Sequence, residues 1–151
     1  MVGNLGDDTA RWQRDDERLL LIFDGHCGIC TRFAEWVQRH DRAQRAQVLP
    51  NQTPGLLHAC GLTRAEVDRE AWVLDRAGRA YGGAAAINRT LRELDGPWAI
   101  IARAYAIPGL RHLEDAGYRW FARHRGRFSR WGAIPACERP GARCASDDDP
   151  A

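Results

Sequence analysis

The chain has 151 residues, of which 44% are hydrophobic and 28% are charged. This length suits a single domain with a packed core, and the composition is that of an ordinary globular protein. The formal net charge of +2 is too small to indicate a nucleic-acid partner by itself. No stretch approaches the roughly 20 apolar residues that span a bilayer, and the first residues lack the apolar region of a secretory signal. We therefore expect a cytoplasmic protein, in a compartment where thiols are held reduced.

The first third of the chain predicts a strand, a helix and a second strand. Residues 1–17 are polar and without periodicity, which predicts a flexible tail. The apolar run Leu19–Phe23 is typical of a strand buried on both faces. After the break at Asp24-Gly25-His26, helical periodicity extends from Cys27 to about His40. Ala46–Leu49 then predicts a short strand that Pro50 ends.

The remainder predicts a hairpin and several helices. Thr63 and Glu66 have the spacing of a capping box, which indicates a helix that begins near Arg64. Ala71–Asp75 and Arg79–Gly82 flank a turn and predict a β-hairpin. Three more helices are expected: one that begins near Gly83, one at Trp98–Ile107 and one at about Leu110–Phe128.

This order of elements, β-α-β-α-β-β-α with two parallel and then two antiparallel strands, predicts an α/β fold of the thioredoxin-like type. We expect three layers, in which helices cover a central four-stranded mixed sheet, and a C-terminal helical extension. Residues 18–135 would form this single domain, and residues 136–151 a flexible C-terminal tail.

Two cysteines separated by two residues stand where the first strand gives way to the first helix. Cys27 and Cys30 would lie on one face of the first turn, close enough to form a disulfide. The positive end of a helix favours a thiolate over a thiol. We expect Cys27 to be the more exposed sulfur and the attacking thiol, and Cys30 to resolve the mixed disulfide. Such exchange needs no bound cofactor; an external thiol or reductase supplies the electrons.

The residues before the dithiol allow two interpretations each. His26, when protonated, would further favour a thiolate at Cys27, or it is a solvated loop residue. Asp24 could accept helix N–H groups or a proton from the resolving thiol, although its charge opposes the thiolate. It could equally be a plain turn or capping residue.

The motif Asp24-x-x-Cys27-x-x-Cys30, which follows the strand in "LLLIFDGHCGIC", resembles the DCC family of thiol-disulfide oxidoreductases. The resemblance extends over about residues 18–130, through "WVLDRAGRAYGGAAAINRTLREL", "GPWAIIARAYAIPGL" and "YRWFARHRGRF". It implies a thioredoxin-like fold and disulfide exchange. Thioredoxins place a cis-proline before the third strand, where it helps to dock the substrate backbone. Here Arg69-Glu70-Ala71 occupies that place without a proline, so we expect trans peptide bonds there.

The other cysteines leave alternatives open. Cys137 and Cys144 could join Cys27 and Cys30 in a four-thiolate zinc or copper site. They could also be a second redox pair that passes electrons to the first, or unpaired thiols in a mobile tail. Cys60, within "LLHACGL", is expected to be a small buried hydrophobic residue.

Arginines and aromatic residues alternate in "YRWFARHRGRFSRW", residues 118–131. Such a helix could lie on an anionic membrane or bind nucleic acid. The alternative, which the low net charge favours, is a C-terminal helix whose aromatic side chains pack on the sheet while its arginines stay in solvent.

The leading hypothesis is a thiol-disulfide oxidoreductase that acts on protein or small-molecule disulfides through Cys27 and Cys30. A thiolate metal-binding module is the second hypothesis. A non-catalytic interaction domain with incidental cysteines is the third, and it would have thiols no more reactive than free cysteine.

Overall fold

A four-stranded sheet is the centre of the protein, for which a computed structural model describes residues 14–128, 133–142 and 144. The strand order is β2-β1-β3-β4, formed by Leu19–Phe23 (β1), Ala46–Pro50 (β2), Trp72–Leu74 (β3) and Ala80–Gly82 (β4). β1 pairs with β2 in parallel, and the pairs β1–β3 and β3–β4 are antiparallel. The predicted mixed sheet is confirmed. Most of the predicted N-terminal tail, residues 1–13, lies outside the described residues.

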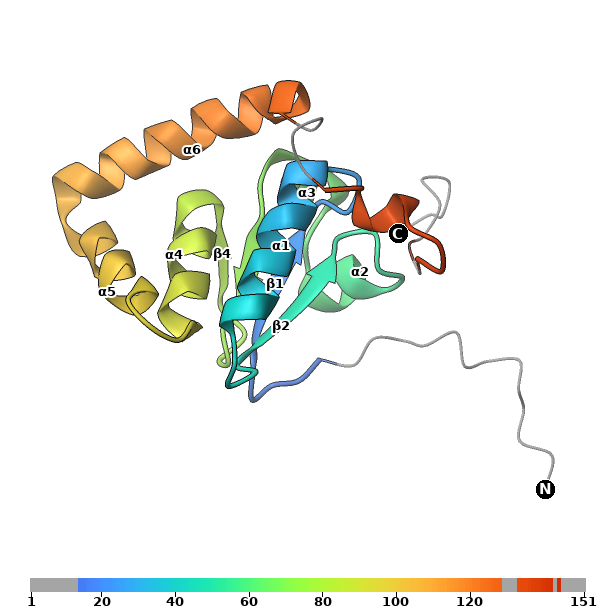
Figure 1. The fold of residues 1–151 in the computed structure, drawn as a ribbon, viewed down its shortest axis with the longest axis horizontal. Coiled ribbons are helices and arrows are strands. Elements are labelled where there is room, and N and C mark those ends of the chain that lie inside the picture. The colour runs from blue at the N-terminus through green and yellow to red at the C-terminus, as the bar shows by residue number, and fades with distance from the viewer. Residues whose placement is uncertain (1–13, 129–132, 143, 145–151) are drawn as a thin grey trace.

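Helices cover both faces of the sheet and complete the three predicted layers (Figure 1). Leu19 and Leu21 of β1 belong to a cluster with side chains of α1 (Gly28–His40) and α4 (Gly83–Glu93). The alternate residues, Leu20 and Ile22, pack against α2 (Leu56–Cys60) on the other face. α3 (Arg64–Arg69) lies on this second side and begins with the predicted capping box. Because both faces of β1 are covered, all five of its residues are buried.

Two expectations for the helices need correction. α2 was not predicted, because its five residues are too few for a helical period to be recognised. The expected helix at Trp98–Ile107 is α5 (Trp98–Arg103) followed by a 3₁₀ turn, η1 (Ala104–Ala106). Cys60 is half-buried in α2 rather than fully buried, and burial raises the pKa of its thiol.

The long C-terminal helix, α6 (Pro108–Phe128), packs on α4 instead of on the sheet (Figure 1). The side chain of Asn88 in α4 donates a hydrogen bond of 2.8 Å to the carboxylate of Glu114 in α6. Tyr118 and Phe121 face α4 around a shallow hollow that both helices line. The expected packing of the aromatic side chains on the sheet is therefore wrong for Phe121, which faces α4, whereas the Tyr118 hydroxyl reaches the backbone N–H of Ala71 next to β3. No helix among the described residues combines the length and the apolar character that crossing a bilayer requires.

Substitution of a core leucine should destabilise the protein far more than substitution of an exposed one. Leu21 is fully buried in β1, whereas the side chain of Leu113 in α6 is 69% exposed. Leu21→Ala should lower the free energy of unfolding by about 2–5 kcal/mol, and Leu113→Ala by less than about 0.5 kcal/mol. Urea denaturation followed by circular dichroism measures both. Equal effects would contradict the assignment of β1 to the core.

Candidate functional site

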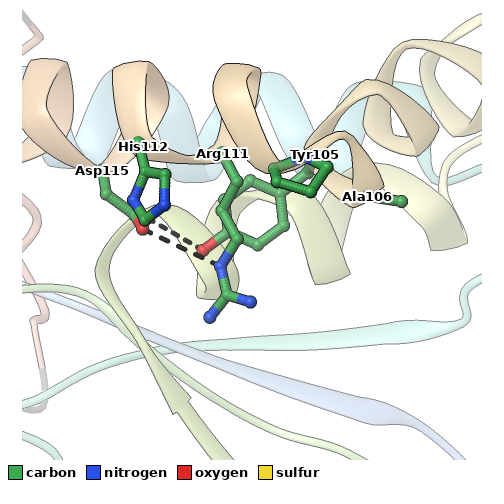
Figure 2. A pocket seen from close by; sticks show the side chains of 6 residues that line it. Tyr105, Ala106, Arg111, His112 and Asp115 are labelled. Atoms are coloured by element: carbon green, nitrogen blue, oxygen red, sulfur yellow. Dashed lines mark hydrogen bonds and ion pairs between the residues drawn. The ribbon is translucent and has the colours of Figure 1, made fainter.

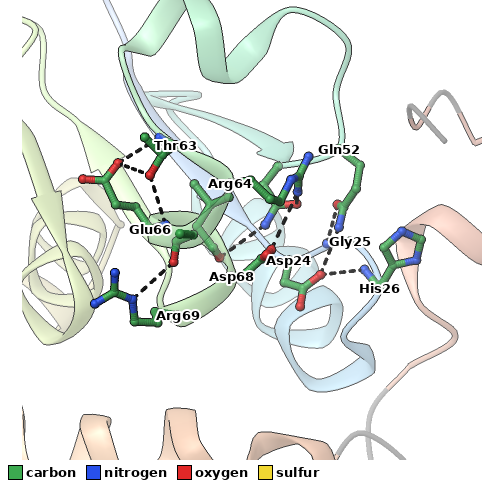
Figure 3. A network of polar contacts seen from close by, with 12 residues as sticks. Asp24, Gly25, His26, Gln52, Thr63, Arg64, Glu66, Asp68 and Arg69 are labelled. Carbon is green, nitrogen blue, oxygen red and sulfur yellow. Dashed lines mark hydrogen bonds and ion pairs between the residues drawn. The ribbon is translucent and has the colours of Figure 1, made fainter. Parts of the chain in front are cut away.

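Asp24, Gly25 and His26 form a loop that a buried glutamine holds in place. The amide oxygen of Gln52 accepts a hydrogen bond of 2.9 Å from the backbone N–H of Gly25, and its amide nitrogen donates one of 3.1 Å to Asp24. The Asp24 carboxylate also accepts from the backbone N–H of His26, at 3.0 Å (Figure 3). Gln52 follows β2 and Asp24 follows β1, so the parallel pairing of these strands brings the two side chains together.

The two cysteines of the motif lie together at the first turn of α1. Cys27 is the N-cap of this helix, and its sulfur accepts a hydrogen bond of 3.3 Å from the backbone N–H of Cys30. The Cys30 thiol also donates to this sulfur, and this bond contributes most to lowering the pKa of Cys27 to about 7, against the opposing effect of burial. The same bond and burial raise the pKa of Cys30 far above the ordinary value. Near neutral pH, a large fraction of Cys27 is therefore thiolate, whereas Cys30 remains a thiol.

The exposure of the two sulfurs is the reverse of what the sequence led us to expect. Cys27 is only 5% exposed, whereas Cys30 is half-buried. Backbone N–H groups of the C-terminal segment donate to the carbonyl oxygens of Gly25 and Gly28, on either side of Cys27. This segment packs on the first turn of α1, and the sequence pattern contains no sign of that contact.

A partly buried ion pair adds two opposing charges to the site. Arg125, near the end of α6, lies with its guanidinium nitrogen 3.5 Å from the Asp24 carboxylate. It also donates a hydrogen bond to the backbone oxygen of Asp68. The charge of Asp24 raises the pKa of Cys27, and the charge of Arg125 lowers it. Both effects are smaller than those of Cys30 and of burial. The predicted opposition between Asp24 and the thiolate is thus present, and Arg125 offsets it.

His26 is exposed at the tip of the loop, with its ring directed away from Asp24 (Figure 3). Its backbone N–H contributes to the geometry of the loop through Asp24. A role of the imidazole in favouring the Cys27 thiolate stays a prediction.

Tyr118 of α6 lies next to Arg69-Glu70-Ala71, the residues at the place where thioredoxins have the substrate-docking proline. The backbone N–H of Ala71 donates a hydrogen bond of 2.8 Å to the hydroxyl oxygen of Tyr118. Burial raises the pKa of Tyr118 to about 12, with a smaller contribution from the nearby Cys30. The peptide bonds of Arg69-Glu70-Ala71 are trans, as expected without a proline.

An open groove of about 540 Å³ begins at Tyr118 and runs between the end of α3 and α6. Its walls carry both charges, from Asp68, Arg69, Glu70, Tyr118, Arg119, Ala122 and Arg123. Neither Cys27 nor Cys30 lines this groove, and the lining residue nearest in effect to the dithiol is Tyr118, whose pKa the nearby Cys30 raises.

A second hollow, of about 450 Å³, lies at the corner between η1 and α6 (Figure 2). The Tyr105 hydroxyl donates a hydrogen bond of 2.8 Å to Asp115, and Arg111 pairs with the same carboxylate at 3.9 Å. Arg125 lies on the same helix, roughly 15 Å further along its axis than Asp115. The polar groups of this hollow bind one another, so we assign it to the helix corner and not to the site.

The two C-terminal cysteines are bonded to each other and not to the first pair. Cys137 and Cys144 form a disulfide with each other, which corrects the expectation of unpaired thiols in a loose tail. A short 3₁₀ turn, η3 (Ala136–Glu138), also orders this part of the predicted tail. Within the described ranges, no group of three or more His, Cys, Asp or Glu side chains could hold a metal ion.

Sequence reasoning missed Gln52, Tyr118 and Arg125. Gln52 follows a predicted strand, but its partner is 28 residues earlier in the chain. Arg125 is one of several arginines in the C-terminal helix, and only the path of that helix singles it out. Neither position has a local signal in the sequence.

Removal of the Cys30 thiol should weaken the acidity of Cys27. In Cys30→Ala the hydrogen bond from the thiol is lost, so the pKa of Cys27 should rise from about 7 toward the value of a free thiol, about 8.5. The rate of iodoacetamide alkylation of Cys27 as a function of pH measures this pKa. An unchanged pKa would show that the helix terminus alone sets the acidity.

Neutralisation of the two charges beside the dithiol should shift the same pKa in opposite directions. Asp24→Asn removes a negative charge and should lower the pKa of Cys27, whereas Arg125→Gln should raise it. Arg127→Gln, at an exposed position of the same helix, is the matched control and should leave the pKa unchanged. A shift in the control as large as that in Arg125→Gln would indicate a general effect of net charge.

The family comparison agrees with this geometry. The model of the DCC1-like thiol-disulfide oxidoreductase family matches residues 21–131, which include both cysteines of the motif. A chloroplastic DCC family protein of Arabidopsis thaliana is 27% identical over 134 residues, which cover 87% of this chain and 75% of the relative. No solved structure matches the chain significantly. The family model matches well over half of the chain, and the protein therefore belongs to the DCC1-like thiol-disulfide oxidoreductase family.

Proposed function

We propose that this protein exchanges disulfides through Cys27 and Cys30, with Cys27 as the nucleophile and Cys30 as the resolving thiol. The family supports thiol-disulfide oxidoreductase activity in general. The observation that carries the assignment to these two sulfurs is their unequal acidity. The pKa of Cys27 is lowered to about 7 and that of Cys30 is raised, so one sulfur is ready to attack while the other keeps its proton.

The exchange begins when the Cys27 thiolate attacks a substrate disulfide and displaces one substrate thiolate. Cys30 then loses its proton and attacks the Cys27 sulfur, which releases the second substrate thiolate and leaves a Cys27–Cys30 disulfide. Two electrons pass to the substrate, and an external thiol or reductase restores the dithiol. Asp24 is the group we propose to accept the Cys30 proton, because its charge acts on both sulfurs.

The groove beside Tyr118 supports a protein or small-molecule disulfide as the substrate. It is open, its lining includes Tyr118, whose pKa the nearby Cys30 raises, and its walls carry both acidic and basic side chains. A peptide segment bound there would run past the Tyr118 hydroxyl, at the edge where thioredoxins dock substrate backbone.

Trapping of the mixed disulfide tests the proposal. In Cys30→Ser the second step is blocked, so incubation with oxidised glutathione should leave Cys27 joined to glutathione in most molecules. Cys27→Ser is the matched control and should retain no adduct at the motif. Disulfide mapping by mass spectrometry of alkylated protein measures both. If Cys27 in Cys30→Ser forms adducts no faster than Cys60, the assignment of Cys27 as nucleophile fails.

A further inference from the structure

The C-terminal segment is hydrogen-bonded to the residues around the nucleophile. The backbone N–H of Cys137 donates to the carbonyl oxygen of Gly25 at 3.0 Å, and that of Ala133 donates to Gly28 at 3.2 Å. The backbone N–H of Ala136 donates to the Thr31 hydroxyl at 3.0 Å. These three acceptors lie before and after Cys27, so the segment runs across the first turn of α1 (Figure 1).

A salt bridge holds the same segment to the side of α1. The guanidinium of Arg139 lies 2.5 Å from the carboxylate of Glu35. Together with the three backbone hydrogen bonds, this pair fastens residues 133–139 along the helix that carries the dithiol.

The Cys137–Cys144 disulfide packs directly on the loop of the motif. A Cβ atom at Gly25 would lie 2.6 Å from the Cys137 sulfur, so this close approach requires glycine. The Cys137 sulfur is also 3.6 Å from the amide oxygen of Gln52, the side chain that holds Gly25 and Asp24. The second disulfide thus shares its packing with the loop that positions the nucleophile.

The two cysteine pairs differ in oxidation state, and Cys27 is less exposed than Cys30 and than either half of the C-terminal disulfide. Cys137 and Cys144 are bonded to each other, whereas Cys27 and Cys30 are free thiols. Cys27 is 5% exposed, but both half-cystines of the C-terminal disulfide are half-buried. An external partner therefore reaches the C-terminal pair more easily than it reaches Cys27.

From this arrangement we infer that Cys137–Cys144 is a second redox-active disulfide, which exchanges electrons with the Cys27/Cys30 dithiol and connects it to an external thiol or disulfide. The inference rests on the proposed function of the dithiol. The covered position of Cys27 supports it, because the segment against this thiol itself carries a disulfide.

The transfer is an intramolecular exchange in which atoms and electrons balance. The Cys27 thiolate attacks one sulfur of the C-terminal disulfide, so a bond from Cys27 forms while the Cys137–Cys144 bond breaks and leaves one thiolate. Cys30 then attacks Cys27 and closes the first disulfide, and the proton that it loses passes to the released C-terminal sulfurs. Two electrons move from the first pair to the second in this direction, and the exchange is reversible. In the direction that the proposed function requires, an external thiol reduces Cys137–Cys144, and the resulting C-terminal dithiol reduces the Cys27–Cys30 disulfide that each turnover leaves.

Variants that lack both resolving thiols test the contact between the pairs. In Cys30→Ser/Cys144→Ser and in Cys30→Ser/Cys137→Ser, one C-terminal sulfur remains, and any bond that it forms with Cys27 cannot be resolved. After oxidation with glutathione, at least one of these variants should contain the bond from Cys27 to the C-terminal cysteine in most molecules. Cys60, retained throughout, is the internal control, because pairing of Cys27 with Cys60 to the same extent would indicate random oxidation of unfolded chains.

A turnover measurement distinguishes an electron relay from a C-terminal segment that only shields Cys27. The double variant Cys137→Ser/Cys144→Ser should lose activity in the reduction of insulin by dithiothreitol, because electrons no longer pass through the second pair. If its activity equals or exceeds that of the wild type, or if neither cross-link forms, the relay is overturned. The dithiol itself is judged separately. Wild-type activity of Cys27→Ser would overturn the proposed function. Glutathione adducts at Cys27 in the triple variant Cys30→Ser/Cys137→Ser/Cys144→Ser would uphold the proposed function without the relay.

Discussion

The hydrogen bonds that Cys30 donates to the Cys27 sulfur determine the chemistry of the site. They come from the thiol and from the backbone N–H of one residue, and together they place a stabilised thiolate beside a protonated thiol. This geometry exists only if α1 begins at Gly28, so that Cys27 is its N-cap. The start of the helix in turn depends on the loop that Gln52 and Asp24 hold at the end of the two parallel strands.

The elements that rest on local patterns could be predicted from the sequence. The uninterrupted apolar run of β1 indicated a strand covered on both faces, and the Thr63 capping box marked the start of α3. The spacing of Cys27 and Cys30 placed both sulfurs on one helical turn, which is a short-range consequence of helix geometry. The parallel pairing of the first two strands and the antiparallel pairing of the last two followed from these elements, because few connections between them are sterically possible.

The features that depend on distant parts of the chain could not be predicted. Cys27 is covered by a segment more than 100 residues later in the sequence, and Arg125 reaches Asp24 only through the path of α6. Both contacts join polar groups that look like solvated surface in the sequence. The pairing of Cys137 with Cys144 could not be predicted either, because their spacing alone permits a metal site, a disulfide or free thiols.

The long helix α6 contacts both α4 and the loop that carries Asp24. Near its first third, Glu114 accepts a hydrogen bond from Asn88 of α4, and near its end Arg125 pairs with Asp24. These two attachments are roughly 16 Å apart along the helix axis. A displacement of α4 that α6 follows would therefore move the guanidinium that lies beside Asp24. One helix thus connects the contacts of α4 with a charge next to the dithiol.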